Sequence, residues 1–231
     1  MVRDQVMIKN EVKKNIFIAG GLLALTALIG TGLMVLVNSH SNPYIVENER
    51  QVLLRSLHSV IPPDSYSNNI LQDTLLMKDQ QLLGSIDEIL VYRAKTDSKP
   101  IAAALTVIAP NGYNGDISLL VGINYTGQVT GVRVVKHRET PGLGDGIEIR
   151  RSNWIESFTG KSLNNPGDSG WKVKRDGGEF DQFTGATITP RAVISAVHKA
   201  VLFFNKNRSL IFPATNAADI NKLSDKLDRE L

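Results

Sequence analysis

Residues 181–193 read Asp-Gln-Phe-Thr-Gly-Ala-Thr-Ile-Thr-Pro-Arg-Ala-Val, and this stretch joins a loop of small residues to the start of a helix. Gly185 and Ala186 are small, so a bulky group can approach the neighbouring backbone and the Thr187 hydroxyl closely. The sequence contains neither a Walker A pattern nor a G-x-G-x-x-G fingerprint. The ordinary nucleotide-binding loops are therefore excluded.

A strongly apolar helix is expected over residues 192–204, with Thr189 as its cap and Pro190 in its first turn. The free N–H groups and the dipole at the start of such a helix favour a phosphate nearby. Thr187 therefore stands where a phosphate ester could be held. From spacing alone, however, turn and capping roles are the simpler explanation of these threonines.

The chain before this stretch is rich in short β-type runs. Four such runs cover residues 86–94, 101–109, 117–123 and 129–135. Turn signals separate them, among them Pro110-Asn111-Gly112. Short β-rich runs divided by glycine and asparagine predict an antiparallel meander.

The segments around the meander are less regular. Residues 147–158 are expected to be helical, with Ile147, Ile155 and Phe158 facing inward, and residues 171–175 are expected to add a strand. Residues 65–83 are compatible with helix or loop. The fold class is therefore α+β, with an antiparallel-rich sheet and flanking helices.

Residues 16–37 carry no charged side chain and are rich in Leu, Ile, Ala and Val. A helix of this length spans about 33 Å, enough for the hydrocarbon core of a bilayer. A buried soluble helix would show a polar stripe, and a cleavable signal peptide would have a shorter apolar region. We therefore expect an uncleaved, single transmembrane helix.

The flanking charges predict the orientation of that helix. Arg3, Lys9, Lys13 and Lys14 precede the apolar stretch, whereas no Lys or Arg follows it until Arg50. The positive-inside rule then places the N-terminus in the cytoplasm.

Four parts are expected along the chain. They are a cytoplasmic N-terminus (residues 1–15), the transmembrane helix (16–37), an extracytoplasmic domain (38–206) and a polar C-terminal tail (207–231). A second helix, opened by Asn42-Pro43 and ending near residue 60, is expected at the start of the domain, with Val46, Val52, Leu53, Leu57 and Val60 on its apolar face.

Composition excludes several kinds of site. The chain has 231 residues, a formal net charge of +3 and no cysteine. So small a charge gives no reason to expect nucleic acid binding. Without cysteine, the chain holds no disulfide, iron–sulfur cluster or zinc–thiolate site. The histidines show no metal-ligand spacing, and no general acid is marked, so neither metal ligands nor catalytic residues are assigned.

Two motifs carry a resemblance to known proteins. The pattern Asp-x-x-Thr-Gly-Ala-Thr at residues 181–187 resembles the flavinylation motif of FMN-binding domains, whose last threonine carries FMN through a phosphoester bond. The wider stretch 181–193 is similar to the G subunit of Rnf-type electron transport complexes, also called Rsx. Residues 137–145, His-Arg-Glu-Thr-Pro-Gly-Leu-Gly-Asp, agree with the E-T-P-G-L-G segment of the same family. The resemblance runs from the anchor to about residue 204.

The resemblance implies that Thr187 is the covalent FMN acceptor. Asp181, Thr184, Gly185 and Ala186 would form the motif that an FAD-dependent flavin transferase reads. Asp181 could alternatively be a surface or capping carboxylate, and Thr184 a turn residue.

The second motif implies a loop near the isoalloxazine ring, formed by Glu139, Thr140, Leu143 and Gly144. Glycine lets backbone N–H groups approach the ring, and leucine packs on its apolar face. The alternative is a Pro-Gly turn between strand and helix. Trp154 and Trp171 could stack on the flavin but are more often core residues, and Lys136 and His137 stay unassigned.

The family resemblance implies an electron-relay subunit of an ion-translocating oxidoreductase complex in the bacterial inner membrane, with its main domain in the periplasm. Its partners would be other membrane and iron–sulfur subunits and the flavin transferase. One apolar helix without an ionisable residue cannot conduct ions, so ion pumping would belong to the partners. The isolated chain would have no turnover of its own.

Three alternatives remain open. The C subunit of the sodium-pumping NADH:quinone reductase shares the anchor, the motif and FMN, although the short length and the Thr-Pro-Arg-Ala-Val continuation favour the Rnf-type family. A non-redox, membrane-anchored binding module would bind no flavin. A free-standing reductase would need an open substrate pocket beside the flavin and turnover by the isolated domain.

Overall fold

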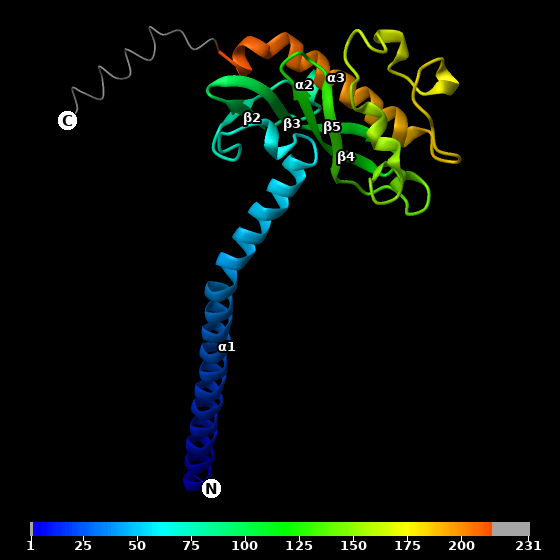
Figure 1. Cartoon of the computed structure of the whole chain (residues 1–231). Helices are drawn as coiled ribbons and strands as arrows, with labels where there is room; N and C mark the ends of the chain where they lie inside the picture. The colour runs from blue at the N-terminus through cyan, green and yellow to red at the C-terminus, as the bar shows by residue number, and fades with distance from the viewer. Residues whose placement is uncertain (1, 214–231) are drawn as a thin grey trace, which may run out of the picture. The chain divides into compact units, whose positions relative to one another are not determined.

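The computed structural model describes the backbone of residues 2–213 and the side chains of residues 20–36 and 47–213. The chain divides into two compact units, residues 1–53 and 54–231, and each is described by itself. The first unit consists of most of helix α1 (Val2–His58) (Figure 1).

Helix α1 contains the stretch from which a transmembrane helix is expected. Residues 16–37 are helical as predicted, and the side chains of residues 20–36 are exposed. Among the residues with described side chains, no helix is long and apolar enough to cross a membrane. Residues 1–19 and 37 lie outside that set, so part of the expected span and the expected cytoplasmic stretch are not covered by this finding.

Helix α1 is longer than the sequence predicts. Instead of a separate helix opened by Asn42-Pro43, α1 runs through Pro43 to His58. The proline costs this helix one backbone hydrogen bond without ending it. Leu57 and Val60 are buried as predicted, whereas Val52 is exposed and precedes the second unit.

The second unit is built on a five-stranded antiparallel sheet in the order β1-β2-β3-β4-β5 (Figure 1). The strands are β1 (Thr74–Met77), β2 (Ile89–Thr96), β3 (Lys99–Gly112), β4 (Gly115–Asn124) and β5 (Val129–Lys136). Short turns join β2 to β3, β3 to β4 and β4 to β5, whereas the connection from β1 to β2 contains a short helix, α2 (Gln80–Leu83). This confirms the predicted meander, and β1 lies in a stretch whose structure the sequence left open.

The β3–β4 hairpin reaches further than the sequence suggests. Pro110-Asn111-Gly112 is not the turn, because β3 continues to Gly112 and the turn consists of Tyr113 and Asn114. The strand register shifts between Ala109 and Gly112. Pro110 therefore lies at a bulge, where its missing N–H is tolerated.

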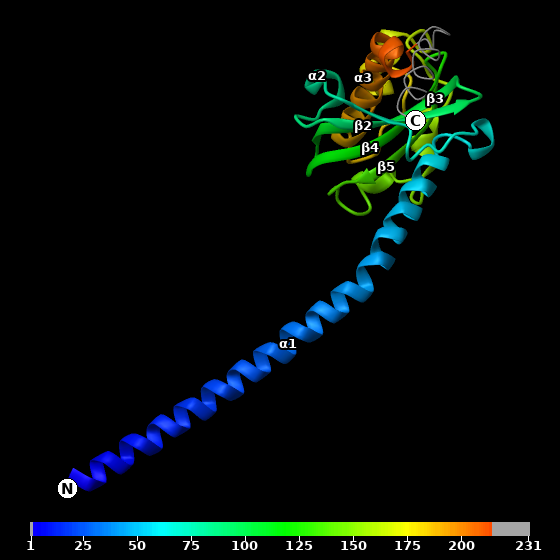
Figure 2. The same cartoon turned by 90° about the vertical axis from the view of Figure 1, so that its left-hand side faces the viewer.

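Both faces of the sheet are covered. Figure 1 and Figure 2 show helix α3 (Ile188–Ile211) lying across one face, where it packs on β3 and β4. Alternate strand residues such as Leu105, Val121 and Ile123 fill the core beneath it. On the other face, residues just after α1 pack so closely that a Cβ on Gly122 would lie 2.6 Å from the Val60 carbonyl oxygen.

Between β5 and α3 the chain forms short 3-10 helices instead of the expected α-helix. Two of them, Gly144–Ile147 and Asn153–Phe158, cover the region predicted as helix. Glycines in the first disfavour a regular α-helix. The three predicted inward residues, Ile147, Ile155 and Phe158, are all buried.

The prediction of a strand over residues 171–175 is wrong. Within the described chain, Val173 makes only an isolated bridge to Phe180, and Lys174–Asp176 is a 3-10 turn closed by Gly177. The other 3-10 helices are Pro63–Ser65 and Asp168–Gly170, and a short α-helix, α2 (Gln80–Leu83), follows β1.

Helix α3 begins earlier and ends later than predicted. Its N-cap is Thr187, not Thr189, which lies in the first turn. The helix continues to Ile211, which is buried, so residues 207–211 of the expected tail belong to it. Residues 214–231 lie outside the described part.

The packing of α2 on β3 can be tested at Gly84. Gly84 closes α2 with a φ of +71°, and a Cβ there would lie 2.0 Å from the Ile108 carbonyl oxygen. Gly177 has a φ of +82°, and no described atom lies within 4 Å of its Cβ position. Both Gly→Ala changes carry the cost of a left-handed conformation, about 1 kcal/mol. Only Gly84→Ala adds overpacking, about 1–3 kcal/mol. Urea unfolding of the full chain should therefore show a larger loss for Gly84→Ala, and equal losses would contradict this packing.

Candidate functional site

One pocket brings the two sequence motifs together. Its volume is about 370 Å³, within the range of about 300–1,000 Å³ that is usual for small-molecule sites. The pocket is lined by Tyr113, Glu139, Thr140, Leu143, Gly144, Gly185, Ala186, Thr187, Ile188 and Thr189. All predicted site residues line it except Asp181 and Thr184.

A tight turn brings the motif at residues 181–187 to the pocket. The Ala186 N–H donates to the Phe183 carbonyl oxygen at 3.2 Å, and Gly185 has a φ of +79°. These features fit a type II turn, whose third residue must adopt a positive φ. A Cβ on Gly185 would lie 3.6 Å from Leu143 Cδ2, so the turn and the motif at residues 137–145 are in close proximity.

Thr187 occupies the N-cap of α3 at the pocket wall. Its side chain is half-buried, and its hydroxyl makes no capping hydrogen bond in the described chain. The N–H groups of Ile188 and Thr189 lie in the first turn, where no earlier helical carbonyl can pair with them. None of the described lining residues is Lys, Arg or His. An anion held here would therefore depend on backbone N–H groups and the helix dipole.

Glu139 joins three separate segments of the chain. Its side chain is only 4% exposed. The Thr189 hydroxyl donates to Oε2, and the Asn114 N–H donates to Oε1 at 3.0 Å. The Tyr113 N–H lies at 3.4 Å from Oε2. One buried carboxylate thus connects the β3–β4 hairpin, the loop after β5 and the first turn of α3.

Neighbouring contacts fix the loop at residues 137–145. The Asn114 side-chain amide donates to Thr140 Oγ1 at 3.0 Å, and the Thr140 carbonyl accepts from Leu143 and Gly144 at 3.1 Å. A Cβ on Gly144 would lie 2.8 Å from Glu139 Oε2. Only glycine fits at this position without displacing the buried carboxylate.

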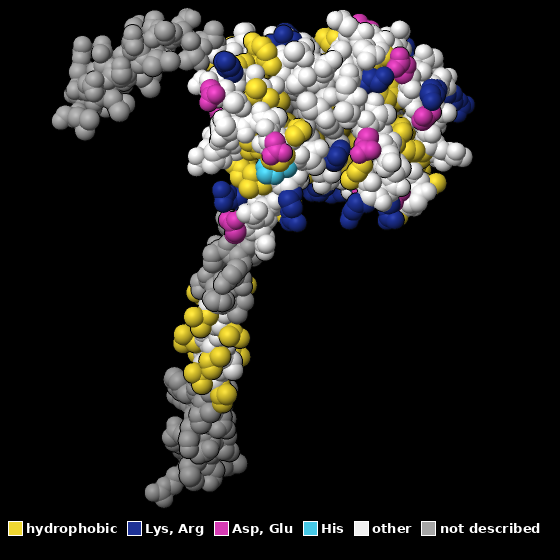
Figure 3. Space-filling model, viewed as in Figure 1, with side chains coloured by type: hydrophobic (Ala, Val, Ile, Leu, Met, Phe, Trp, Pro, Cys, Tyr) yellow, Lys and Arg dark blue, Asp and Glu magenta, His cyan; other side chains and the backbone are white. Residues whose placement is uncertain are grey.

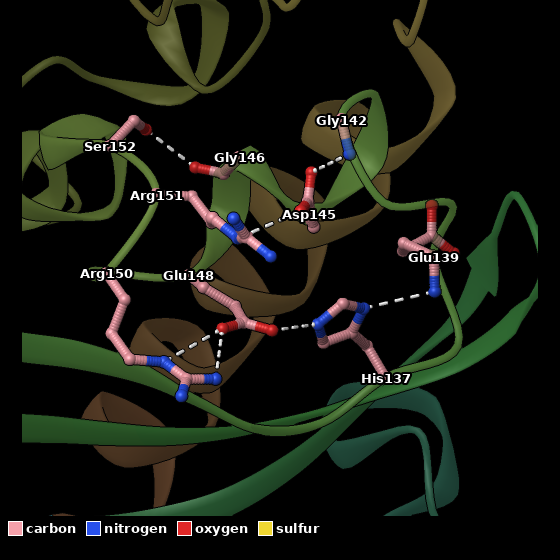
Figure 4. Close-up of polar contacts among 9 residues, drawn as sticks. All are labelled: His137, Glu139, Gly142, Asp145, Gly146, Glu148, Arg150, Arg151 and Ser152. Carbon is pink, nitrogen blue, oxygen red and sulfur yellow. Dashed lines mark hydrogen bonds and ion pairs between the residues drawn. The ribbon is translucent and has the colours of Figure 1, made fainter.

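A polar network supports this loop from the side of β5 (Figure 4). The Glu139 N–H donates to His137 Nδ1 at 3.0 Å, and His137 Nε2 lies 2.7 Å from Glu148 Oε1. Because Nδ1 accepts, Nε2 carries the proton in neutral His137. The hydrogen bond from His137, followed by that from Arg150, holds the pKa of Glu148 below its usual value.

The far end of the loop is held in the same way. Asp145 Oδ1 accepts from the Gly142 N–H at 2.8 Å, and its Oδ2 lies 3.1 Å from Arg151 Nε. The Ser152 hydroxyl donates to the Gly146 carbonyl at 2.6 Å (Figure 4). The loop therefore has a defined conformation, set by its own side chains together with contacts from Asn114 and Thr189.

Asp181 and Thr184 lie outside the pocket, and both are exposed. The Asp181 carboxylate lies 2.6 Å from Lys174 Nζ, and its carbonyl oxygen accepts from Trp154 Nε1 at 2.7 Å. These contacts fix the backbone just before the turn. Recognition of Asp181 and Thr184 by a flavin transferase stays a prediction.

Neither tryptophan lines the pocket. Trp154 packs edge-on against Phe158 and Phe183, with ring centroids 5.3 and 5.2 Å away. Trp171 is buried and stacks on His198 at 5.0 Å. Both tryptophans therefore pack with core residues, as the alternative to stacking on the flavin predicts.

Sequence reasoning missed part of the site. Tyr113 and Asn114 escape notice when the turn is assigned to residues 110–112. Thr189 matches a helix cap, which is the common role of threonine before proline, whereas its hydroxyl is buried against Glu139. A prediction that treated Pro110 as a β-bulge would have placed the hairpin tip at Tyr113 and Asn114. No signal in the sequence marked the Glu139–Thr189 contact.

The chain is similar to known proteins over both units. The FMN-binding domain family matches residues 112–202, and the RnfG N-terminal region matches residues 7–60. A protein of Shewanella baltica is 49% identical over 88% of this chain and 94% of its own length. Proteins of Pseudomonas aeruginosa (47% identical; 85% and 92%) and Pseudoalteromonas atlantica (45% identical; 90% and 95%) are also similar. Each of the three is named as the G subunit of an ion-translocating oxidoreductase complex.

The contact between Thr189 and Glu139 can be tested by removing the hydroxyl. Thr189→Val keeps the shape of the side chain but leaves a buried carboxylate oxygen short of a donor, which should cost about 1–3 kcal/mol of unfolding free energy. Thr184→Val, the same change at an exposed position of the same stretch, should stay within about 0.5 kcal/mol of the wild type. Urea unfolding measures both. Similar losses in the two variants would show that the contact is unimportant.

The lowered pKa of Glu148 predicts how stability depends on pH. Because the pKa of Glu148 is lower in the folded than in the unfolded chain, its contribution is present above the usual glutamate value of about 4.3. That contribution is lost as the pH falls through the lower folded value. Glu148→Gln should therefore flatten the acid side of the stability profile, measured by urea unfolding below about pH 5. Glu156→Gln, at an exposed position, is the control and should keep the wild-type slope.

Proposed function

The chain belongs to the RnfG family, the G subunits of ion-translocating oxidoreductase complexes, and from this premise we propose that it relays electrons through an FMN esterified to Thr187. The FMN-binding domain, residues 112–202, includes β4, β5 and the start of α3, and hence both motifs of the pocket. The convergence of these motifs on one pocket is the observation that carries the proposal.

Thr187 is the threonine best suited to carry the phosphoester. Three threonines lie close together here, but the Thr189 hydroxyl is buried and donates to Glu139, and Thr184 lies outside the pocket. Thr187 lines the pocket at the start of α3. There the helix dipole and unpaired N–H groups would stabilise the negative charge of the ester.

The pocket walls suit a planar aromatic ring system. Tyr113, Leu143 and Ile188 each leave a large part of their side chains exposed at the pocket. Such surfaces would pack against a flat apolar face. A bound FMN supplies one- and two-electron chemistry, and the protein orients it and tunes its potential. The covalent link keeps the flavin in place without relying on free FMN in the surroundings.

Attachment would require an FAD-dependent flavin transferase. Of the residues it would read, Thr184, Gly185 and Ala186 lie in the turn and Asp181 lies just before it, outside the core. Exposure of Asp181 and Thr184 makes them accessible to an enzyme without unfolding the domain. This role is inferred from the motif and from that exposure.

The membrane arrangement is part of the same proposal. Residues 16–37 form an uncleaved inner-membrane span, residues 1–15 stay in the cytoplasm, and the domain from residue 38 lies in the periplasm. The supports are the uncharged composition of the span and the basic residues before it. Ion movement then belongs to the other membrane and iron–sulfur subunits, because one uncharged helix offers no conduction path.

The proposal is tested by co-expressing the full chain with a flavin transferase. The wild-type chain should give a fluorescent flavin band in a denaturing gel, and mass spectrometry should place the added FMN on the peptide containing Thr187. Thr187→Ala should abolish the band, because no other hydroxyl has the same position. Thr159→Ala, at an exposed position, is the control and should keep it. A band that persists in Thr187→Ala would place the flavin elsewhere, and a colourless wild type would favour a non-redox binding module.

A further inference from the structure

A second, basic pocket lies beside the cofactor pocket. Its volume is about 280 Å³, and Lys136, Arg138 and Asn114 contribute to its walls. The two pockets share the tip of the β3–β4 hairpin, because Tyr113 lines the first and Asn114 the second. They are also joined through the chain after β5, where Arg138 is followed directly by Glu139. A group bound in the basic pocket would therefore stand close to the proposed flavin.

The two cations of this pocket are available to an outside group. Lys136 and Arg138 are exposed, and neither forms an ion pair with another described residue. Asp116 is the single acid among the described lining residues. The pocket thus presents a net positive charge to solvent.

The surrounding chain extends this positive surface by directing its acids inward. Between residues 133 and 151 the sequence has five basic and three acidic residues. Glu139 and Asp145 are only 4% and 6% exposed. In contrast, the side chains of Arg150 and Arg151 are 83% and 61% exposed. Figure 3 shows Lys and Arg side chains along one edge of the folded unit.

We propose that the basic strip, defined as Lys136, Arg138, Arg150 and Arg151, is the docking surface for the protein that exchanges electrons with the flavin. That partner would present an acidic face beside its own redox centre. The inference rests on the proposed function, since it assigns a partner to the same pocket.

Position favours a protein over a lipid surface as the occupant. Arg138 of the strip directly precedes Glu139 of the cofactor pocket, and Tyr113 and Leu143 of that pocket are exposed apolar side chains. An apolar centre flanked by charge is the usual anatomy of a protein interface. Charge at the rim accelerates encounter and fixes orientation, which suits brief electron-transfer contacts.

The test uses charge reversal with a matched control. Full-length chains carrying Lys136→Glu with Arg138→Glu, or Lys78→Glu with Lys99→Glu, undergo the same change in net charge. Lys78 and Lys99 are exposed and lie outside the strip. Each chain is mixed with the remaining complex, purified from cells whose own copy of this protein has been deleted, and the association rate is measured at increasing NaCl concentrations.

The Lys136→Glu, Arg138→Glu chain should associate at least about 10-fold more slowly than the wild type at low salt, because it loses electrostatic steering. This difference should shrink as salt screens the charges. The control should stay within about 2-fold of the wild type, since charges far from the contact steer weakly. The proposal would be overturned if both variants associated equally slowly, or if neither associated more slowly than the wild type.

Two further measurements separate this proposal from its alternatives. The flavin band of each variant should match that of the wild type, so slower association with a full band concerns docking alone. A missing band in the wild type would instead overturn the attachment to Thr187. Acetylation of Lys136 is also followed in vesicles of phosphatidylcholine with and without phosphatidylglycerol. Equal labelling is expected, and protection by phosphatidylglycerol would assign the strip to lipid instead.

Discussion

The buried carboxylate of Glu139 is the contact on which the pocket depends. A carboxylate away from water is costly unless donors surround it. Here the donors come from the Thr189 hydroxyl and the N–H groups of Asn114 and Tyr113. If the hairpin, the loop or the helix moved away, it would leave the carboxylate underpaired. Burial therefore turns one side chain into a constraint on the relative positions of three segments.

The topology of the sheet explains why these segments meet. In an antiparallel meander, the end of β3, the start of β4 and the end of β5 lie at the same end of the sheet. The hairpin tip and the loop after β5 are therefore neighbours before any side chain acts. Helix α3 adds the third segment because it begins at that end of the sheet, where Thr189 contacts Glu139. The motifs are far apart in sequence, yet the order of the strands brings them together.

The sequence predicts what local patterns encode and misses what tertiary contacts decide. The strands follow from short apolar runs, and the pocket residues from two motifs. Pro110 misled the assignment of the hairpin because a bulge accommodates a proline that normally marks a turn. Thr189 fits the pattern of a cap, and only the buried Glu139 makes it an internal donor. The spacing of apolar residues in the segment after β5 predicted an α-helix. The glycines there explain why the segment forms 3-10 turns instead.

The hydrogen bonds that fix the loop after β5 also determine the charge of its surface. Glu139, Asp145 and Glu148 each accept hydrogen bonds from within the loop or its neighbours, which holds their carboxylates at or below the surface. Arg150 and Arg151 pair with Glu148 and Asp145, yet most of each arginine side chain is exposed, and Lys136 and Arg138 are exposed without an ion pair to another described residue. A sequence segment with five basic and three acidic residues thereby gains a positive exterior. The hydrogen bonds that hold the acids of this loop thus leave its cations outside, where a partner approaching the proposed flavin would meet them.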